Sequence, residues 1–91
     1  MFTQISISDQ VKLLVWNKGG PATRNGVDVS NEYRFDKYGT AMRFVDYGNR
    51  NSEYGWEIDH IIPASLGGSD HYSNLQPLNW KNNSAKSNNL I

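Results

Sequence analysis

The chain has 91 residues and contains no cysteine, and this combination limits how it can hold a fold together. A chain of this length suits a single domain with a small core, because small domains bury only a modest fraction of their surface. Many small domains compensate with disulfide bonds or thiolate-bound zinc, and both are excluded here. Five tyrosines, three tryptophans and three phenylalanines are the available substitute, because each aromatic side chain buries a large apolar area.

The charges of the chain balance, with nine basic and nine acidic residues. A protein that coats nucleic acid is usually strongly basic, because phosphate neutralisation drives such binding. A nuclease can be neutral overall, since acidic metal ligands offset a local basic face. No apolar run approaches the roughly 20 residues of a membrane span, and the N-terminus lacks the positive-then-apolar order of a secretory signal. We expect a soluble cytoplasmic protein without a membrane partner.

The beginning of the chain predicts a helix followed by a loop. Ser8 is a suitable N-cap and residues 19–21 (Gly-Gly-Pro) are a suitable stop, which places the helix over residues 8–18. Residues 21–31 are rich in Gly, Asn, Asp and Ser and are expected to form a loop.

A β-hairpin is predicted next, with strands at residues 32–35 and 41–45. The turn between them has Gly39 where a positive φ is expected. The hairpin carries Arg34 and Arg43, which can face either phosphate or solvent. Solvent exposure or a structural role is the favoured interpretation of both.

The last third of the chain predicts two strands and a helix. Residues 56–62 form the most strand-like run, and Pro63 ends it. After a glycine-containing loop, residues 74–76 can form a second short strand. Pro77 suits the first turn of a helix over residues 78–87.

This last third also gathers the polar side chains that can carry chemistry. Asp59 and His60 end the first strand, and the helix carries Asn79, Asn83 and Lys86. Offsets of four and seven residues return to nearly the same helix face, so the three helix residues are expected to project together. If the helix packs beside the strand, a carboxylate, an imidazole, an amide oxygen and an ammonium meet in one cleft.

Such a set suits phosphodiester hydrolysis. Carboxylate and amide oxygens are hard ligands for Mg²⁺, which polarises the scissile phosphate and stabilises the departing oxygen. A histidine with an unperturbed pKa near ~6.5 can take a proton from the attacking water at neutral pH. The Asn74 side chain, which follows the loop, can hold that loop or orient the imidazole.

Four linked segments in chain order resemble the HNH endonuclease family over residues 54–88. They are Glu57-Ile58-Asp59-His60-Ile61-Ile62-Pro63, Gly67-Gly68-Ser69-Asp70, Ser73-Asn74-Leu75-Gln76-Pro77-Leu78 and Asn82-Asn83-Ser84-Ala85-Lys86-Ser87. The resemblance implies an α+β fold in one HNH nuclease domain over residues 1–91. Residues 1–50 would hold the N-terminal helix and hairpin, and residues 54–88 the ββα-metal core.

The resemblance also implies a role for each site residue. His60 corresponds to the general base and Asp59 to the metal ligand beside it, while Asn74 corresponds to the asparagine that braces the loop and helps to position the base. Asn83 stands where the family has a histidine or asparagine ligand. Lys86 stands where a basic residue commonly contacts phosphate, although it would also complement the dipole of the helix end. The implied cofactor is one divalent ion, Mg²⁺ first, with Mn²⁺, Ni²⁺ or Zn²⁺ as alternatives.

One departure from the family is plain in the residues. Many relatives add a structural zinc held by four cysteines, two of which fall near Asn79 and Asn82, so this chain would be a version without that zinc. Trp56, Trp80 and Tyr54 are expected to supply apolar packing instead. Because that zinc is separate from the catalytic ion, its loss does not bear on catalysis.

Three functions stay open on the sequence, and the favoured one is a metal-dependent HNH endonuclease acting on nucleic acid, DNA rather than RNA. The alternatives are a catalytically inactive nucleic-acid-binding module of the same fold and a nuclease toxin domain with an immunity partner. Of the remaining polar residues, His71 is expected to be exposed to solvent, and Glu57 shares strand parity with Asp59 and can support the site.

Overall fold

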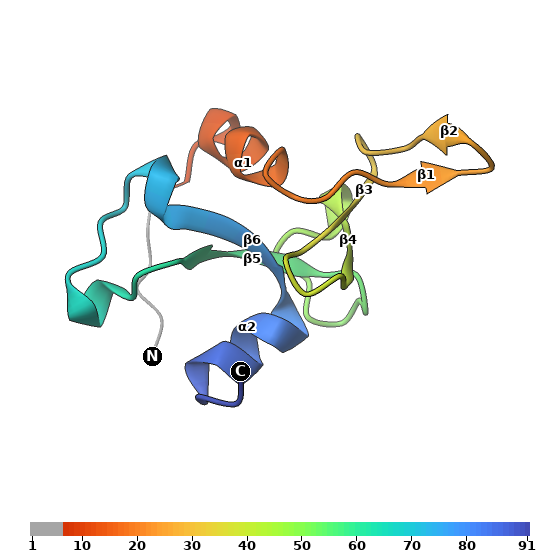
Figure 1. Ribbon diagram of the computed structural model, residues 1–91. Helices are drawn as coiled ribbons and strands as arrows, with labels where there is room; N and C mark the ends of the chain where they lie inside the picture. Colours follow the sequence, from red (N-terminus) through yellow and green to blue (C-terminus); the bar gives the residue numbers. More distant parts are fainter. Residues whose placement is uncertain (1–6) are drawn as a thin grey trace.

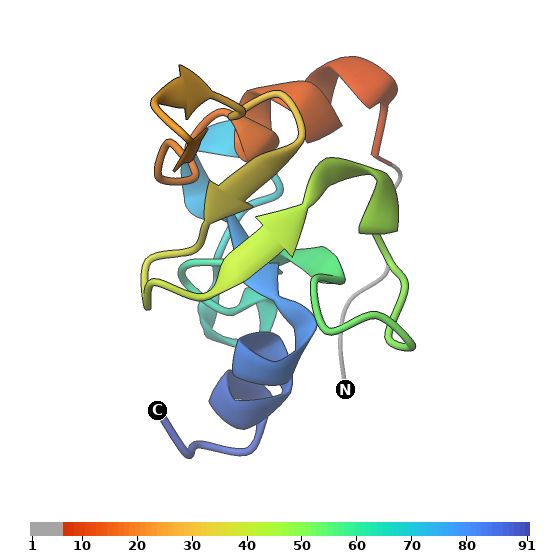
Figure 2. The same ribbon diagram turned by 90° about the vertical axis from the view of Figure 1, so that its right-hand side faces the viewer.

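The computed structural model describes residues 7–91, so residues 1–6 of the expected domain lie outside the described residues. The described elements are α1 (Asp9–Trp16), β1 (Thr23–Arg24), β2 (Val27–Asp28), β3 (Tyr33–Phe35), β4 (Ala41–Arg43), η1 (Phe44–Asp46), β5 (Trp56–His60), η2 (Ala64–Leu66), η3 (Tyr72–Asn74), β6 (Leu75–Asn79) and α2 (Trp80–Ser87). The strands form three antiparallel pairs, β1–β2, β3–β4 and β5–β6. Figures 1 and 2 show α1 and α2 on opposite sides of the β5–β6 pair. The predicted α+β fold is confirmed.

The helix predicted over residues 8–18 is α1, within a residue or two at each end. The Ser8 hydroxyl accepts a hydrogen bond from the Val11 N–H at 3.1 Å, which satisfies a donor of the first turn. The helix buries Val15 and Trp16, the apolar side chains nearest its C-terminal end.

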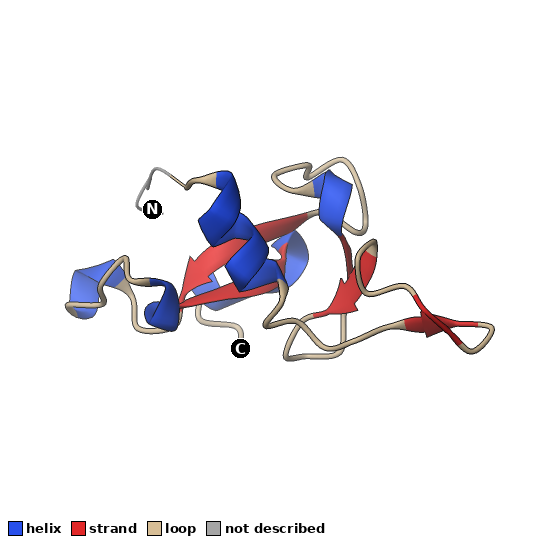
Figure 3. Ribbon diagram, turned by 90° about the horizontal axis from the view of Figure 1, so that it is seen from above, coloured by secondary structure: helices blue, strands red, loops and turns tan. Residues whose placement is uncertain are grey.

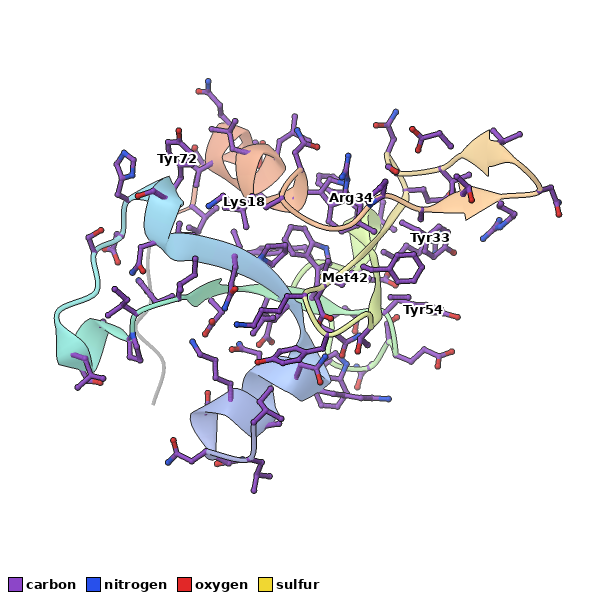
Figure 4. All side chains as sticks on the ribbon, in the orientation of Figure 1. Lys18, Tyr33, Arg34, Met42, Tyr54 and Tyr72 are labelled. Carbon is purple, nitrogen blue, oxygen red and sulfur yellow. The ribbon has the colours of Figure 1, made fainter. Side chains whose placement is uncertain are left out.

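Lys18 joins the end of α1 to the beginning of β6. Its ammonium donates to the carbonyl oxygen of Leu75 at 2.7 Å and also to that of Tyr72. Figure 4 shows the Lys18 side chain extending toward Tyr72. Burial lowers the pKa of Lys18. Lys18 thus attaches the N-terminal half of the chain to η3 and to the first residue of β6.

The core is aromatic, as the composition predicts. Trp16, Met42 and Trp56 are buried together, and Phe44 packs against them. The ring centroids of Trp16 lie 5.0 Å from those of Trp56 and 5.3 Å from those of Phe44. Figure 4 shows Met42 in the interior, near the end of the β5–β6 pair that adjoins β3 and β4. This cluster draws its buried members from α1, β4 and β5, and β6 adds the fully buried Leu75 and Leu78 to the core.

Tyr54 packs at the surface rather than in the core. Its side chain is 36% exposed and meets the ring of Tyr33 edge-on, with centroids 5.8 Å apart (Figure 4). Trp80 is only half-buried, and its indole N–H donates to the carbonyl oxygen of Ser52 at 2.7 Å. Trp56 alone of the three expected residues is fully buried.

Two local predictions in the N-terminal half need correction. Residues 21–31 contain the β1–β2 hairpin, which projects from the body of the molecule in Figure 3. Asn25 and Gly26 form its turn with φ angles of 52° and 79°, the positive values that a two-residue hairpin loop requires. The strand predicted over residues 41–45 ends at Arg43, because the chain turns into η1.

The position of Pro77 is the main error of the sequence interpretation. Pro77 lies inside β6 opposite Ile58, and α2 begins only at Trp80, with Asn79 as its N-cap. In an antiparallel pair, residues that face each other are hydrogen-bonded only at every second position. The bonds from Ile61 to Asn74 and from Trp80 to Gly55 fix this alternation, and the Ile58–Pro77 pair falls at a position without hydrogen bonds. A strand tolerates proline there because the missing N–H would face away from the partner strand.

A buried carboxylate joins the β3–β4 turn to the beginning of α2. One oxygen of Asp36 accepts hydrogen bonds from the backbone N–H of Asn79 at 3.0 Å and from the side chain of Asn82 at 2.8 Å. The other oxygen accepts from the backbone N–H groups of Tyr38 and Thr40, both at 3.0 Å. Asp36 is 5% exposed, and four donors compensate for the burial of its charge.

Asn79 extends this cluster to two further segments. Its side-chain nitrogen donates to the carbonyl oxygens of Ala41 at 3.0 Å and Glu53 at 2.8 Å. Asn79 and Asn82, where the resemblance implied two of the zinc-binding cysteines of many relatives, both donate to the Asp36 carboxylate. The hydrogen bonds of Asn79 therefore connect the beginning of α2 to the β3–β4 turn, to β4 and to the segment before β5.

We predict that Asp36→Asn lowers the free energy of unfolding by about 2–4 kcal/mol, because an amide presents donors to groups that are themselves donors. Urea denaturation measures the change. Asp9→Asn is the matched control, since its side chain is fully exposed on α1, and it should change stability by less than about 1 kcal/mol. Equal stabilities of the two variants would contradict the role given to Asp36.

Candidate active site

The side chains of β5 alternate between two faces, one that packs in the core and one that carries candidate site residues. Trp56 and Ile58 belong to the core side of the strand, whereas Glu57 and Asp59 contact side chains of α2. Since successive side chains of a strand point to opposite faces, this division follows directly from the sequence. The surface between β5 and α2 therefore carries two carboxylates.

The Asp59 side chain is 13% exposed, and its carboxylate is held through one of its oxygens. That oxygen accepts hydrogen bonds from the Lys86 ammonium at 2.6 Å and from the Gln76 side chain at 2.9 Å. Lys86 also donates to the carbonyl oxygen of His60 at 2.6 Å. Among residues 7–91, the second carboxylate oxygen of Asp59 has no hydrogen-bond donor, which leaves it available as a ligand.

Asn83 of α2 contacts Glu57, which lies on the same face of β5 as Asp59, two residues before it. Its side-chain nitrogen donates to Glu57 at 2.8 Å. Glu57 in turn binds the Arg50 guanidinium through both oxygens, at 2.7 and 2.8 Å. Burial would raise the pKa of Glu57, but the hydrogen bonds from Arg50 and Asn83 and the charge of Arg50 lower that pKa below its ordinary 4.5. Glu57 is thus a carboxylate at neutral pH.

The imidazole of His60 is oriented by a residue of the following loop. Its Nε2 lies 2.7 Å from a carboxylate oxygen of Asp70. Because a carboxylate only accepts hydrogen bonds, Nε2 carries the proton, and Nδ1 is then the basic nitrogen. The side chain of His60 is 12% exposed. Asp70 belongs to the motif segments but has no role predicted from the sequence, since only the folded loop brings it to the histidine.

Asn74 closes the loop that separates β5 from β6. Its side-chain oxygen accepts from the Ile62 N–H at 2.9 Å, and its nitrogen donates to the carbonyl oxygens of Ile62 at 3.1 Å and Ser69 at 2.8 Å. The Ile61 N–H also donates to the backbone carbonyl of Asn74 at 2.8 Å. These bonds fix the chain directly after His60, while a part for Asn74 in catalysis stays a prediction.

Two residues considered with the site lie apart from it. Asn79 was expected to share a helix face with Asn83, and this is wrong, because Asn79 precedes the helix and is buried against Asp36. His71 is exposed, as predicted, and its ring contacts Ser73.

The two hairpin arginines have local partners. Arg34 donates to the carbonyl oxygens of Gly19 at 2.8 Å and Ser30 at 3.2 Å, which confirms a structural role. Arg43 faces Glu32 across 3.9 Å, a partly exposed pair.

The donor chemistry between β5 and α2 fits a hard divalent ion. Asp59 and Asn83 each have one oxygen without a hydrogen-bond donor within residues 7–91, and Mg²⁺ typically binds one or two protein oxygens while keeping several waters. Within the same residues, no three His, Cys, Asp or Glu side chains are grouped as in a metal site. The set therefore suits a weakly held, water-rich ion rather than a structural zinc.

Comparison with known proteins identifies one family. The family model described as HNH endonuclease matches residues 45–89, which include β5, β6 and α2. No curated protein and no solved structure matches the chain. In residues 7–91, the helices are all too short or too polar to cross a membrane.

We predict that Asn74→Ala lowers the free energy of unfolding by about 1–2 kcal/mol, because three hydrogen bonds of the loop are lost. Amide exchange at Ile62 should become faster, while exchange at Val15 in α1 changes little. Hydrogen exchange followed by NMR separates the two sites. Asn51→Ala, at an exposed turn position, is the control, and Ile62 exchange at the wild-type rate in Asn74→Ala would contradict the bracing role.

Proposed function

The chain belongs to the HNH endonuclease family, and from this membership we propose that it is a metal-dependent endonuclease that hydrolyses phosphodiester bonds in nucleic acid, with DNA preferred over RNA. One observation carries the proposal: the imidazole of His60, the residue that follows Asp59 at the end of β5, is held by the Asp70 carboxylate at 2.7 Å. A protein that only binds nucleic acid has no need of a proton acceptor that is oriented by a carboxylate. Orientation of such a group is what general-base catalysis requires.

His60 would act through Nδ1, the nitrogen that the Asp70 contact leaves unprotonated. It takes a proton from the attacking water, and the positive charge that forms on the ring is stabilised by the Asp70 carboxylate 2.7 Å away. The hydroxyl oxygen then bonds to phosphorus as the bond to the 3′ oxygen breaks. A water-based step of this kind needs no covalent intermediate with the protein.

Asp59 and Asn83 would hold the divalent ion through their free oxygens. When bound, such an ion supplies polarisation of the scissile phosphate and neutralises charge on the departing 3′ oxygen. Mg²⁺ is the proposed ion, since the donors are hard oxygens. The Lys86 ammonium, 2.6 Å from Asp59, would lie beside a phosphate bound there, and we propose that it contacts that phosphate.

We predict that His60→Ala slows plasmid cleavage by about 10²–10⁴-fold in Mg²⁺, because the general base is lost. The rate of plasmid relaxation and linearisation on gels measures this. His71→Ala is the matched control, and it should cleave like the wild type, because His71 is exposed and contacts only neighbouring residues of its own loop. EDTA should abolish cleavage in all three proteins.

Three outcomes separate this proposal from its rivals. Undiminished cleavage by His60→Ala would contradict the mechanism. Plasmid binding by the wild type without cleavage, in Mg²⁺ and in Mn²⁺, would favour the inactive binding module. Growth arrest of cells that produce the wild type, relieved by His60→Ala, would point to a toxin domain.

A further inference from the structure

The orientation of the Asn83 amide determines whether this residue can ligate a metal ion. An asparagine side chain ends in one oxygen and one NH₂ group, and only the oxygen can bind a cation. The two ends have nearly the same shape, so packing alone does not select between them. A neighbour that accepts hydrogen bonds but cannot donate them would make the selection.

Glu57 is such a neighbour. Its carboxylate lies 2.8 Å from the side-chain nitrogen of Asn83, and it can only accept. If the amide were turned over, its oxygen would face a carboxylate oxygen at the same place, which is repulsive. The contact therefore turns the NH₂ group of Asn83 toward Glu57 and leaves the side-chain oxygen of Asn83 without a hydrogen-bond partner among residues 7–91.

Arg50 fixes Glu57 in this role. Its guanidinium binds both carboxylate oxygens, a planar two-point contact that sets the orientation as well as the position of the carboxylate. Arg50 is itself held, because it donates to the Ser84 hydroxyl at 3.2 Å and lies over the Trp80 ring at 5.8 Å. The side chain of Glu57 is 20% exposed, so solvent weakens the pair only partly.

We propose that Glu57 is a positioning residue of the metal site, which holds the Asn83 amide with its oxygen available as a ligand, and that Arg50 fixes Glu57 for this purpose. The inference rests on the proposed function in one respect, that Asn83 is a metal ligand. It adds a chain of contacts from the loop before β5, through β5, to α2. Neither Arg50 nor Glu57 needs to touch the ion or the nucleic acid.

Binding of MnCl₂ to the full chain, without nucleic acid, tests this role through the EPR signal of free Mn²⁺. We expect Glu57→Ala to weaken binding by about 10–100-fold, as is typical when a partner that orients a metal ligand is lost. In the Asn83→Asp background both ends of the side chain are oxygens, so orientation no longer matters. There, Glu57→Ala should weaken binding by no more than about twofold, or should strengthen it by removing a like charge, so the two substitutions are not additive.

Two controls keep the result interpretable. Glu53→Ala removes an exposed acidic side chain from the same region and should leave Mn²⁺ affinity unchanged. Glu57→Gln keeps an accepting oxygen but loses the ion pair with Arg50, so it should weaken binding less than Glu57→Ala. It also serves as the test variant if Glu57→Ala does not fold, as judged by circular dichroism.

Three results would overturn the inference. Wild-type affinity in Glu57→Ala, or in Glu57→Gln where that variant replaces it, would show that orientation is not controlled by Glu57. An equal loss in the wild-type and Asn83→Asp backgrounds would make Glu57 a direct ligand instead. A wild-type chain that binds neither Mn²⁺ nor Mg²⁺ would refute the proposed function and this inference together, which separates that failure from the first two.

Discussion

The placement of α2 against β5 depends on the buried contact between Asp36 and Asn79. α2 carries two of the candidate site residues, and none of its side chains is fully buried, so apolar packing alone does not fix the helix. The Asp36 carboxylate instead receives the backbone N–H of Asn79 at the point where β6 becomes helix. A buried charge that is fully hydrogen-bonded has one favourable arrangement, because any shift leaves a donor or an oxygen without its partner.

The far part of α2 is held by the site itself. Lys86 binds Asp59 and Asn83 binds Glu57, and both of these polar contacts are with the same face of β5. Structural and functional demands therefore coincide here. Asp59 attaches the helix and would also bind the ion, and Glu57 attaches the helix through Asn83, the other proposed ligand. A substitution at either carboxylate should therefore affect both the stability of the fold and the binding of the ion.

Much of the site could be predicted from the sequence because its parts are local. The strand that ends in Asp59 and His60 has a clear pattern, and the motif segments that follow it in chain order implied the ββα unit, which the fold confirms. Pro77 was misplaced because proline is favoured at a helix start and is also tolerated in a strand pair without hydrogen bonds. Only the register of β6 with β5 decides between the two. The partnership of His60 with Asp70 was missed because it spans a folded loop.

The central claim is that the end of β5 and the turns of α2 facing it bind one divalent ion, and paramagnetic NMR tests it most directly. Titration of ¹⁵N-labelled protein with substoichiometric MnCl₂ should broaden the amide signals of Asp59, His60 and Asn83 first, because relaxation by Mn²⁺ falls steeply with distance. Signals of the β1–β2 hairpin, at the other end of the molecule in Figure 1, should stay sharp. Broadening centred elsewhere, or no selective broadening at all, would contradict the account.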